Sequence, residues 1–411
     1  MLRRLKDILF PFWRWYLIYT QPIFNTLALL KLKQKSKLKN KKTIVFFATF
    51  VSTWKHDCLY KLLENSAEFE PIILVCPVIN LGYDHMLTTM DASFSYLKSK
   101  GYNVIKAYNQ ASNKYFNPQR LNPDVIVYLS PYHGQIHKKY RITKNRKILS
   151  VYMPYGFALS SKNDLLFNQL VHNLAYKVFY ETKIHKLLAT EYAINKGINV
   201  EVSGSLIADE LDLALKSFSP KTTGEKLIIW APHHTIDPNG FSSFLTISEF
   251  MLNIAFKYKD KVKWIFKPHP LLKPNLYKHP LWGMHRTDEY YRRWEMSEFS
   301  IIKDGEYANL FVQSDAIILD SISFIAEYLY VNKPMLFTSL HPNLFEQFNC
   351  FGQKALNCIS QMGAITDIEL FINDVIIGND NLQCRREKFY NDVLRSEISP
   401  SLYIYNFLES L

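Results

Sequence analysis

Residues 314–324 of the chain read SDAIILDSISF. The run AIIL has the composition of a buried strand, and the polar residues after it lead into a stretch with helical spacing. A buried strand, a short turn and a helix form the repeating unit of a parallel sheet covered by helices. The segment therefore predicts an α/β fold, with polar side chains at the carboxyl end of a strand, where such sheets bind ligands.

The same unit recurs on both sides of this segment. One series of apolar runs begins at residues 43, 71, 103, 124, 147 and 177, and a second begins at residues 226, 262, 299, 316 and 335. Two series predict two doubly wound, Rossmann-type domains that face each other across a cleft. We expect an N-terminal domain over residues 43–205, a C-terminal domain over 206–365, and a helical tail over 366–411 that packs back on the body.

Composition and charge narrow the class of protein. The 411 residues are 48% hydrophobic, 15% aromatic and 21% charged, which excludes a disordered chain. Residues 1–42 hold eleven basic residues and one acid, so they carry ten of the twelve net positive charges. Because the rest of the chain is nearly neutral, no nucleic-acid partner is expected. Five cysteines without a C-x-x-C pair fit a reducing compartment.

Residues 1–42 also have the pattern of a membrane-surface anchor. Residues 10–19 read FPFWRWYLIY, and seven lysines follow between Lys31 and Lys42. Polar residues interrupt the apolar ones, so there is no clean membrane-spanning stretch. Trp and Tyr favour the headgroup level, and each lysine would add roughly 1 kcal/mol on an anionic leaflet. We expect a basic amphipathic leader on an anionic membrane surface; the alternative is a helix packed on the body and followed by a solvated linker.

Polar residues follow three strands of the second series. The loops read APHHTID over residues 231–237, KPHP over 267–270 and DSIS over 320–323. Because the carboxyl ends of parallel strands lie at the same edge of a sheet, we expect these loops to meet.

The residue types in these loops suit a phosphorylated ligand. A helix start offers hydroxyl and N–H groups to a phosphate, lysine and histidine neutralise charge on a diphosphate leaving group, and glutamate can bind ribose hydroxyls. The expected ligand-binding residues are His233, Lys267, His269, Glu306, Asp320, Ser321, Ser323 and Glu327.

Plainer roles exist for some of these residues. Asp320 and Ser321 could form only a helix N-cap, and the pair His233–His234 could be structural or solvent-facing. The three loop histidines could bind zinc, but no cysteine and no H-x-x-x-H spacing supports them, so we expect no metal. The chain also lacks G-x-G-x-x-G, G-x-x-x-x-G-K-[ST], G-x-S-x-G and H-E-x-x-H, which disfavours several common enzyme classes.

Three motifs in order give the chain a family resemblance. They are KPHP at 267–270, SDAIILDSISF at 314–324 and Lys333–Pro334. In these residues the chain resembles the CDP-glycerol glycerophosphotransferase family, which includes the teichoic-acid primases and polymerases. The resemblance covers residues 226–340 well and the first domain more loosely. It implies a GT-B fold whose C-terminal domain binds the CDP-activated donor, with His269, Ser321 and Ser323 on the donor diphosphate and Lys267 adjacent.

The chain departs from the family pattern in two places. Where the family carries a tryptophan-histidine-glycine turn, the first domain has MPYGF at 153–157, so Tyr155 and Gly156 would lie on the acceptor side without a histidine. Where the family often has P-T-W-R, this chain has PHHT at 232–235. The general base is therefore left open between His133, which follows the strand near residue 124, and His234 or Asp237.

The resemblance implies a transferase. It would move glycerol phosphate or a related polyol phosphate from a CDP-linked donor, without a metal, onto a glycan or lipid-linked precursor of a surface polymer such as a capsule or teichoic acid. Its place would be the cytoplasmic face of the bacterial inner membrane, as a peripheral protein. One alternative is a GT-B glycosyltransferase that uses a sugar nucleotide and the same phosphate site. The other is a non-catalytic scaffold that retains nucleotide binding.

Overall fold

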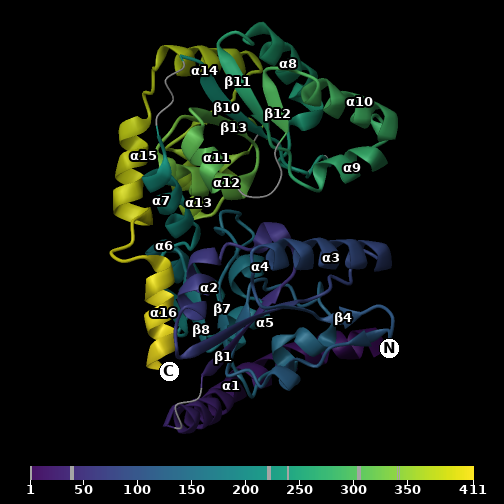
Figure 1. Ribbon diagram of the computed structural model, residues 1–411, viewed down its shortest axis with the longest axis vertical. Helices are drawn as coiled ribbons and strands as arrows, with labels where there is room; N and C mark the ends of the chain where they lie inside the picture. Colours follow the sequence, from purple (N-terminus) through teal and green to yellow (C-terminus); the bar gives the residue numbers. More distant parts are fainter. Residues whose placement is uncertain are drawn as a thin grey trace. The chain divides into compact units, whose positions relative to one another are not determined.

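The computed structural model describes residues 2–37, 41–219, 224–237, 240–302, 307–339, 341 and 343–411. The chain forms two compact units (Figure 1). Unit 1 comprises Met1–Gly156, Lys162–Asp209 and Ser396–Leu411, and unit 2 comprises Phe157–Ser161 and Glu210–Arg395. The division near residue 209 lies close to the predicted domain boundary, whereas the predicted helical tail is shared between the two units.

Unit 1 is built on a parallel sheet with the strand order β3-β2-β1-β6-β7-β8-β9. Parallel pairing follows from the long connections between its strands, most of which carry helices. The order reverses beside β1, between β1 and β6, which is where doubly wound sheets place their ligands. The strands are β1 (Lys42–Ala48), β2 (Phe69–Val75), β3 (Val104–Lys106), β6 (Val125–Tyr128), β7 (Leu149–Tyr152), β8 (Lys177–Tyr180) and β9 (Val200–Val202).

Helices cover this sheet, and a short antiparallel hairpin follows β3. The hairpin strands are β4 (Tyr108–Asn109) and β5 (Lys114–Tyr115). The helices are α1 (Leu2–Lys37), α2 (Asp57–Glu64), α3 (Tyr83–Ser99), α4 (Asn163–Phe167), α5 (Leu170–Leu174), α6 (Lys183–Tyr192) and α16 (Pro400–Ser410). The last helix returns to unit 1, where the Lys42 Nζ donates hydrogen bonds to the carbonyls of Leu408 (3.3 Å) and Glu409 (2.7 Å).

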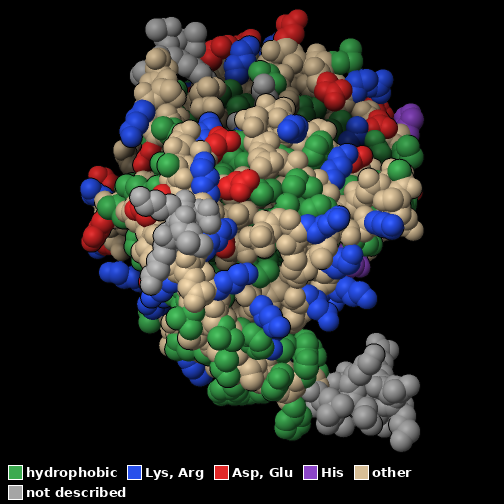
Figure 2. All heavy atoms as spheres, turned by 60° about the horizontal axis from the view of Figure 1, so that its bottom comes forward, with side chains coloured by type: hydrophobic (Ala, Val, Ile, Leu, Met, Phe, Trp, Pro, Cys, Tyr) green, Lys and Arg blue, Asp and Glu red, His purple; other side chains and the backbone are tan. Residues whose placement is uncertain are grey.

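Helix α1 packs along unit 1 (Figure 1). Leu17, Ile18, Gln21 and Leu32 are buried on its inner side. Its outer side carries exposed aromatic and aliphatic residues, and Figure 2, which turns the lower part of Figure 1 toward the viewer, shows hydrophobic side chains gathered near its lower edge. Among the described residues, no helix is both long enough and apolar enough to cross a membrane.

Unit 2 is built on a second parallel sheet, with the strand order β12-β11-β10-β13-β14-β15. The strands are β10 (Lys226–Ala231), β11 (Val262–Phe266), β12 (Ser300–Ile302), β13 (Ala316–Leu319), β14 (Met335–Phe337) and β15 (Ser360–Gln361). The helices are α7 (Ile207–Ser217), which begins in unit 1, α8 (Phe244–Lys257), α9 (Leu272–Lys278), α10 (Gly283–Glu295), α11 (Ala308–Gln313), α12 (Ile322–Tyr328), α13 (Cys350–Leu356), α14 (Thr366–Ile377) and α15 (Gln383–Phe389).

An aromatic core holds the central strands of unit 2. The Phe266 ring, at the end of β11, lies 4.9 Å from the Trp230 ring of β10 and 5.0 Å from the Trp294 ring of α10, measured between centroids. All three side chains are buried. Because close-packed interiors do not deform easily, the ends of β10 and β11 form a rigid base for the loops that follow them.

The predicted fold class is confirmed: both units are α/β, each with a parallel, doubly wound sheet. Every predicted strand is present, within about two residues of its predicted start. Sequence reasoning missed the strands β4, β5, β9 and β15. It also missed the helices α9 and α10, which fill the connection between β11 and β12.

Candidate functional site

Three predicted loops meet at one edge of the unit 2 sheet. β10 pairs with β11 on one side and with β13 on the other, all parallel, so their carboxyl ends are neighbours. The loop after β10 carries His233 and His234, and the loop after β11 carries Lys267 and His269. Asp320 follows β13 directly. The strand-end rule thus brings together residues that are up to 87 positions apart in sequence.

The three histidines form a cluster. The His234 ring lies 4.2 Å from the His233 ring and 4.1 Å from the His269 ring, and the rings of His233 and His269 lie 5.3 Å apart. Each side chain is half-buried. The cluster gives unit 2 a compact set of imidazole nitrogens at the carboxyl edge of its sheet, the edge where doubly wound sheets generally bind ligands.

Backbone hydrogen bonds set the tautomers of two of these rings. The N–H of Leu271 donates to Nδ1 of His269 (3.1 Å), and the N–H of Thr235 donates to Nδ1 of His233 (3.3 Å). The Thr235 hydroxyl also lies 2.8 Å from Nδ1 of His233 and can donate to it, since its oxygen accepts from the N–H of Phe241 (3.1 Å). A backbone N–H can only donate, so each Nδ1 accepts and the proton of the neutral ring lies on Nε2. His233 and His269 therefore each present an Nε2–H donor, which suits an anionic oxygen.

Burial keeps these donors uncharged. It lowers the pKa of His233 and of His269 to about 3, with a smaller contribution from the neighbouring imidazoles. Burial also lowers the pKa of His234, while the nearby Asp237 carboxylate raises it. At neutral pH the cluster is thus a set of neutral dipoles, and the positive charge of the edge comes from Lys267. That side chain is buried, with Nζ 5.9 Å from the ring centroid of Tyr307.

The three histidines are also close enough together to be considered as metal ligands. Ligand atoms of His233, His234 and His269 lie within 4.8 Å of one another, close enough to hold an ion. A metal needs an imidazole lone pair, and the lone pairs of His233 and His269 are engaged by backbone N–H groups. The hydrogen-bonding pattern favours an anion over a cation at this place.

The Asp320 carboxylate joins neighbouring loops, and its predicted ligand-binding role stays a prediction. Its buried carboxylate accepts hydrogen bonds from the N–H of His233 (2.5 Å) through Oδ1, and from the N–H (2.7 Å) and hydroxyl (3.1 Å) of Ser243 through Oδ2. Burial raises the pKa of Asp320, and these hydrogen bonds oppose that rise. The carboxylate joins β13 to the loop after β10 and to the start of α8, so it positions His233.

The two serines stand where the sequence placed them. Ser321 precedes α12, and its side chain makes no hydrogen bond that caps the helix. Ser321 is buried and Ser323 is half-buried. The N-cap alternative for Asp320 and Ser321 therefore does not describe their side chains, because the Asp320 carboxylate bonds to other loops.

The predicted ribose ligands are less accessible. Glu327 is fully buried, and its carboxylate lies against the hydroxyl of Tyr307, which contributes to raising the pKa of that tyrosine after the larger effect of burial. Glu306 lies outside the described residues. The ribose role of both residues stays a prediction.

The first-domain candidates lie at the carboxyl ends of two neighbouring strands of unit 1. His133 follows β6, and Tyr155 and Gly156 follow β7. Among the described residues, Nε2 of His133 is enclosed without a hydrogen-bond partner. Burial, with a smaller contribution from Arg141, lowers the pKa of His133 to about 4. Burial raises the pKa of Tyr155, whose hydroxyl interacts with Tyr132.

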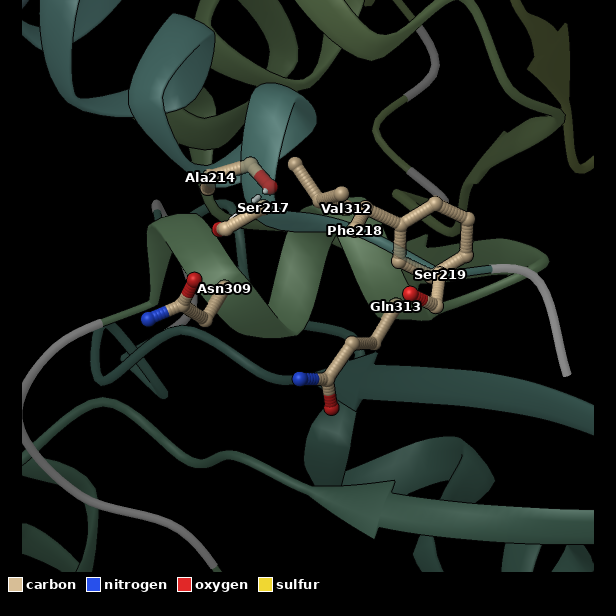
Figure 3. Close-up of a pocket in the computed structure, with 7 residues that line it drawn as sticks. All are labelled: Ala214, Ser217, Phe218, Ser219, Asn309, Val312 and Gln313. Atoms are coloured by element: carbon tan, nitrogen blue, oxygen red, sulfur yellow. Dashed lines mark hydrogen bonds between the residues drawn. The ribbon is translucent and has the colours of Figure 1, made fainter.

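A shallow hollow of about 180 Å³ lies elsewhere in unit 2. It is formed where the end of α7 meets α11, with mostly polar lining (Figure 3). Its lining residues are Ala214, Ser217, Phe218, Ser219, Asn309, Val312 and Gln313. No predicted site residue is among them, so the chemistry of the histidine cluster does not extend to this hollow.

Solved structures match the chain along most of its length. A variant of the wall teichoic acid polymerase TagF has a TM-score of 0.59 at 13% identity, covering 97% of this chain and 97% of its own. The UDP-GlcNAc 2-epimerase of Methanocaldococcus jannaschii, in complex with UDP-GlcNAc and UDP, has a TM-score of 0.58 at 13% identity, covering 90% and 100%. MnaA of S. aureus with UDP has a TM-score of 0.53 at 15% identity, covering 84% and 90%.

These likenesses define the fold. The chain has the two-domain α/β architecture of the GT-B class, as the sequence predicted. No family model matches the chain, and no curated protein matches it in sequence.

Proposed function

We propose that the protein is a transferase that moves glycerol phosphate, or a related polyol phosphate, from a CDP-linked donor to a glycan or lipid-linked precursor of a surface polymer. The observation that carries the proposal is the pair of Nε2–H donors on His233 and His269, in loops at the carboxyl edge of the unit 2 sheet that also carry Lys267. Diphosphates bind where N–H donors and positive charge meet.

The reaction needs a site that stabilises a leaving phosphate. An acceptor hydroxyl attacks the phosphorus that bears the glycerol, the bond from that phosphorus to the bridging oxygen of the diphosphate breaks, and CMP leaves. His233 and His269 would donate to the diphosphate oxygens, and Lys267 would balance the charge that moves onto CMP. Ser321 and Ser323 would add hydroxyl donors. Donors fixed in advance cost no reorganisation during the reaction.

The proton of the acceptor hydroxyl needs a base. We assign this role to His234: burial lowers its pKa, but the Asp237 carboxylate opposes that shift and would stabilise the imidazolium formed on proton uptake. His133 of unit 1 is the competing candidate, with an enclosed Nε2 that has no partner among the described residues. Tyr155 and Gly156 would lie on the acceptor side.

The structural neighbours support a nucleotide-activated donor. TagF is by its name a polymerase of wall teichoic acid, and its structure aligns with 97% of this chain. The motifs KPHP at 267–270 and SDAIILDSISF at 314–324 carry the resemblance to the glycerophosphotransferases independently of the fold. Together they favour the phosphotransferase over a protein that only binds nucleotides.

A second candidate is a glycosyltransferase that uses a sugar nucleotide. It is favoured by the solved complexes of neighbours with UDP and UDP-GlcNAc. The phosphate site would be unchanged, and the attacked atom would be an anomeric carbon, so the leaving group would be a nucleoside diphosphate. The identity of the released nucleotide separates the two reactions.

The first test is a thermal unfolding screen without added metal, with CDP-glycerol, CDP, CMP, UDP and GDP as ligands. A ligand at 100 times its dissociation constant stabilises the folded state by about 2.7 kcal/mol. Selective stabilisation by cytidine ligands, followed by release of CMP in the presence of membrane extracts, is the expected result. Preference for UDP with release of UDP would favour the glycosyltransferase. Stabilisation without turnover of any donor would contradict both enzymes and favour the scaffold.

A further inference from the structure

Helix α1 is fixed to the folded body by specific contacts. The Arg146 guanidinium donates hydrogen bonds to the carbonyl of Leu17 (2.8 Å), the hydroxyl of Thr20 (2.6 Å) and Oε1 of Gln21 (2.8 Å). One turn earlier, Arg14 donates to Oδ1 of Asn168 (2.8 Å). These bonds hold the middle of α1 in one rotation about its axis, so the side chains on its outer side have a fixed direction.

The outer side of α1 is a continuous apolar stripe. Its members recur every three or four residues, which places them in one line along a helix, and each is between 55% and 71% exposed. The stripe consists of Phe12, Tyr16, Tyr19, Ile23, Leu27 and Leu30. At about 1.5 Å per residue, it runs for roughly 27 Å. Trp13 and Trp15 lie exposed on either side of it, and the Trp15 ring stacks on Tyr19 (5.1 Å).

Positive charge borders this stripe. Lys31 and Lys33 are exposed at the end of the stripe, on the next turn of α1 after Leu30. The single acid of residues 1–42 is Asp7, ahead of the stripe. A second copy of the chain would bring like charges together across the contact, which disfavours self-association. An anionic lipid surface complements both the apolar stripe and its basic border.

We propose that α1 lies flat on an anionic phospholipid surface, with the stripe inserted at headgroup depth and Trp13 and Trp15 at the interface. Trp and Tyr favour that depth, and an interfacial helix needs no spanning length. Because α1 is bonded to unit 1, binding also orients unit 1 relative to the membrane. The inference does not depend on the proposed transferase activity; combined with it, it implies an acceptor presented at the cytoplasmic face of the bacterial plasma membrane.

The test is co-sedimentation of the full chain with phosphatidylcholine vesicles and with vesicles that also contain phosphatidylglycerol. We expect binding to the anionic vesicles at physiological salt. The triple variant Tyr16→Ser, Tyr19→Ser, Ile23→Ser should bind more than tenfold more weakly. Replacing Lys31 and Lys33 with Gln should lower affinity roughly fivefold per lysine on anionic vesicles and not on neutral ones.

The matched control is the double variant Leu187→Ser, Ile198→Ser, which removes aliphatic side chains that are at least as exposed from another part of unit 1. It should bind as the wild type does. Unchanged binding by the stripe variant would overturn the proposal, as would a lipid-free dimer that the stripe variant dissociates. Because the stripe is exposed, its variant should keep the wild-type unfolding temperature and the wild-type stabilisation by CDP-glycerol, so failure of membrane binding and failure of donor binding are distinguishable.

Discussion

The backbone N–H of Leu271 donates a hydrogen bond to Nδ1 of His269, 3.1 Å away. That bond uses the lone pair of Nδ1, so the proton of the neutral ring lies on Nε2. The ring can therefore act as a hydrogen-bond donor through Nε2–H. Thr235 does the same for His233 across the neighbouring strand. The loops after β10 and β11 differ in sequence, yet each presents an Nε2–H donor on a neutral imidazole.

Substitutions of His269 should show whether its N–H donor, rather than the imidazole ring as such, is needed for the reaction. His269→Ala removes one fixed donor and should cost at least about 2.7 kcal/mol of transition-state stabilisation, seen as a hundredfold loss in kcat/KM. His269→Gln, whose side-chain NH₂ reaches about as far as Nε2, should recover part of that loss. The measurement is steady-state turnover of CDP-glycerol. His285→Ala, on the exposed side of α10, is the control and should be neutral. Equal activity of the Ala variant and the wild type would contradict a donor role.

Donor binding should not need a metal. The lone pairs of His233 and His269 are engaged by backbone N–H groups, so an ion would have to displace both bonds. We expect the stabilisation by CDP-glycerol to be unchanged by a chelator, and Zn²⁺ alone to give no stabilisation. Thermal unfolding with and without chelator measures both. A shift with Zn²⁺ that disappears in His269→Ala would instead establish a three-histidine metal site.

Asp320 should act through the loops that it joins. Asp320→Ala would leave the N–H groups of His233 and Ser243 without their buried acceptor, at a cost of about 1–3 kcal/mol for each group. We expect a clear drop in the free energy of unfolding and weaker donor binding, because His233 loses its anchor. Urea unfolding and CDP-glycerol titration measure the two effects. Asp260→Asn, at an exposed position of unit 2, should change neither. Full stability of the Ala variant would contradict the positioning role.

The choice of base can be tested by comparing two histidines. His234→Gln should lower kcat by a factor of 10² to 10⁴, the usual range for general-base catalysis, while the stabilisation by CDP-glycerol persists. Asp237→Asn should lower kcat less, because the imidazole remains and loses only its supporting carboxylate. If His133→Gln instead abolishes kcat and His234→Gln does not, the base belongs to unit 1.

The sequence predicted the fold and the meeting of the three strand-end loops for a physical reason. Buried parallel strands such as β10 and β13 are continuous apolar runs, which are easy to recognise in a sequence. Because the two strands are parallel, the polar residues that follow each of them lie at the same edge of the sheet. The helix α10 was missed although its buried residues Thr287, Tyr290, Tyr291 and Trp294 have helical spacing. The elements were predicted mainly from runs of aliphatic residues, whereas the buried side of α10 is mostly aromatic.

Other features of the site depend on contacts that no local pattern reveals. The carboxylate of Asp320 could face a ligand or a loop, and the outcome rests on Ser243, 77 positions away. The tautomer of His269 depends on the turn at Leu271. Likewise, the apolar residues of α1 predicted an amphipathic helix both for a membrane-surface anchor and for a helix packed on the body. The contacts of Arg146 determine which side of α1 packs on unit 1.

Acid should destabilise the protein through its enclosed histidines, and His56 offers the sharpest test. Burial lowers the pKa of His56 to about 3, and its ring packs among Phe46 and Trp54 with Nε2 enclosed and unpartnered within the described residues. An unfolded histidine titrates near 6.5, so between about pH 6.5 and 3 the unfolded state binds more protons. Stability is therefore full above pH 6.5 and falls as the pH is lowered, by up to about 1.4 kcal/mol per pH unit for each such histidine.

His56→Phe should remove one of these contributions. The aromatic neighbours of His56 accommodate a phenyl ring of similar shape, so we expect a change below about 1.5 kcal/mol at pH 7. Between pH 6 and 4 the variant should lose stability less steeply than the wild type. Urea unfolding at pH 7, 6, 5 and 4 measures the slope, and His285→Phe, which replaces an exposed imidazole, should keep the wild-type slope. A wild-type slope in His56→Phe would mean that His56 is already protonated in the folded protein, and that acid sensitivity has its origin in other groups.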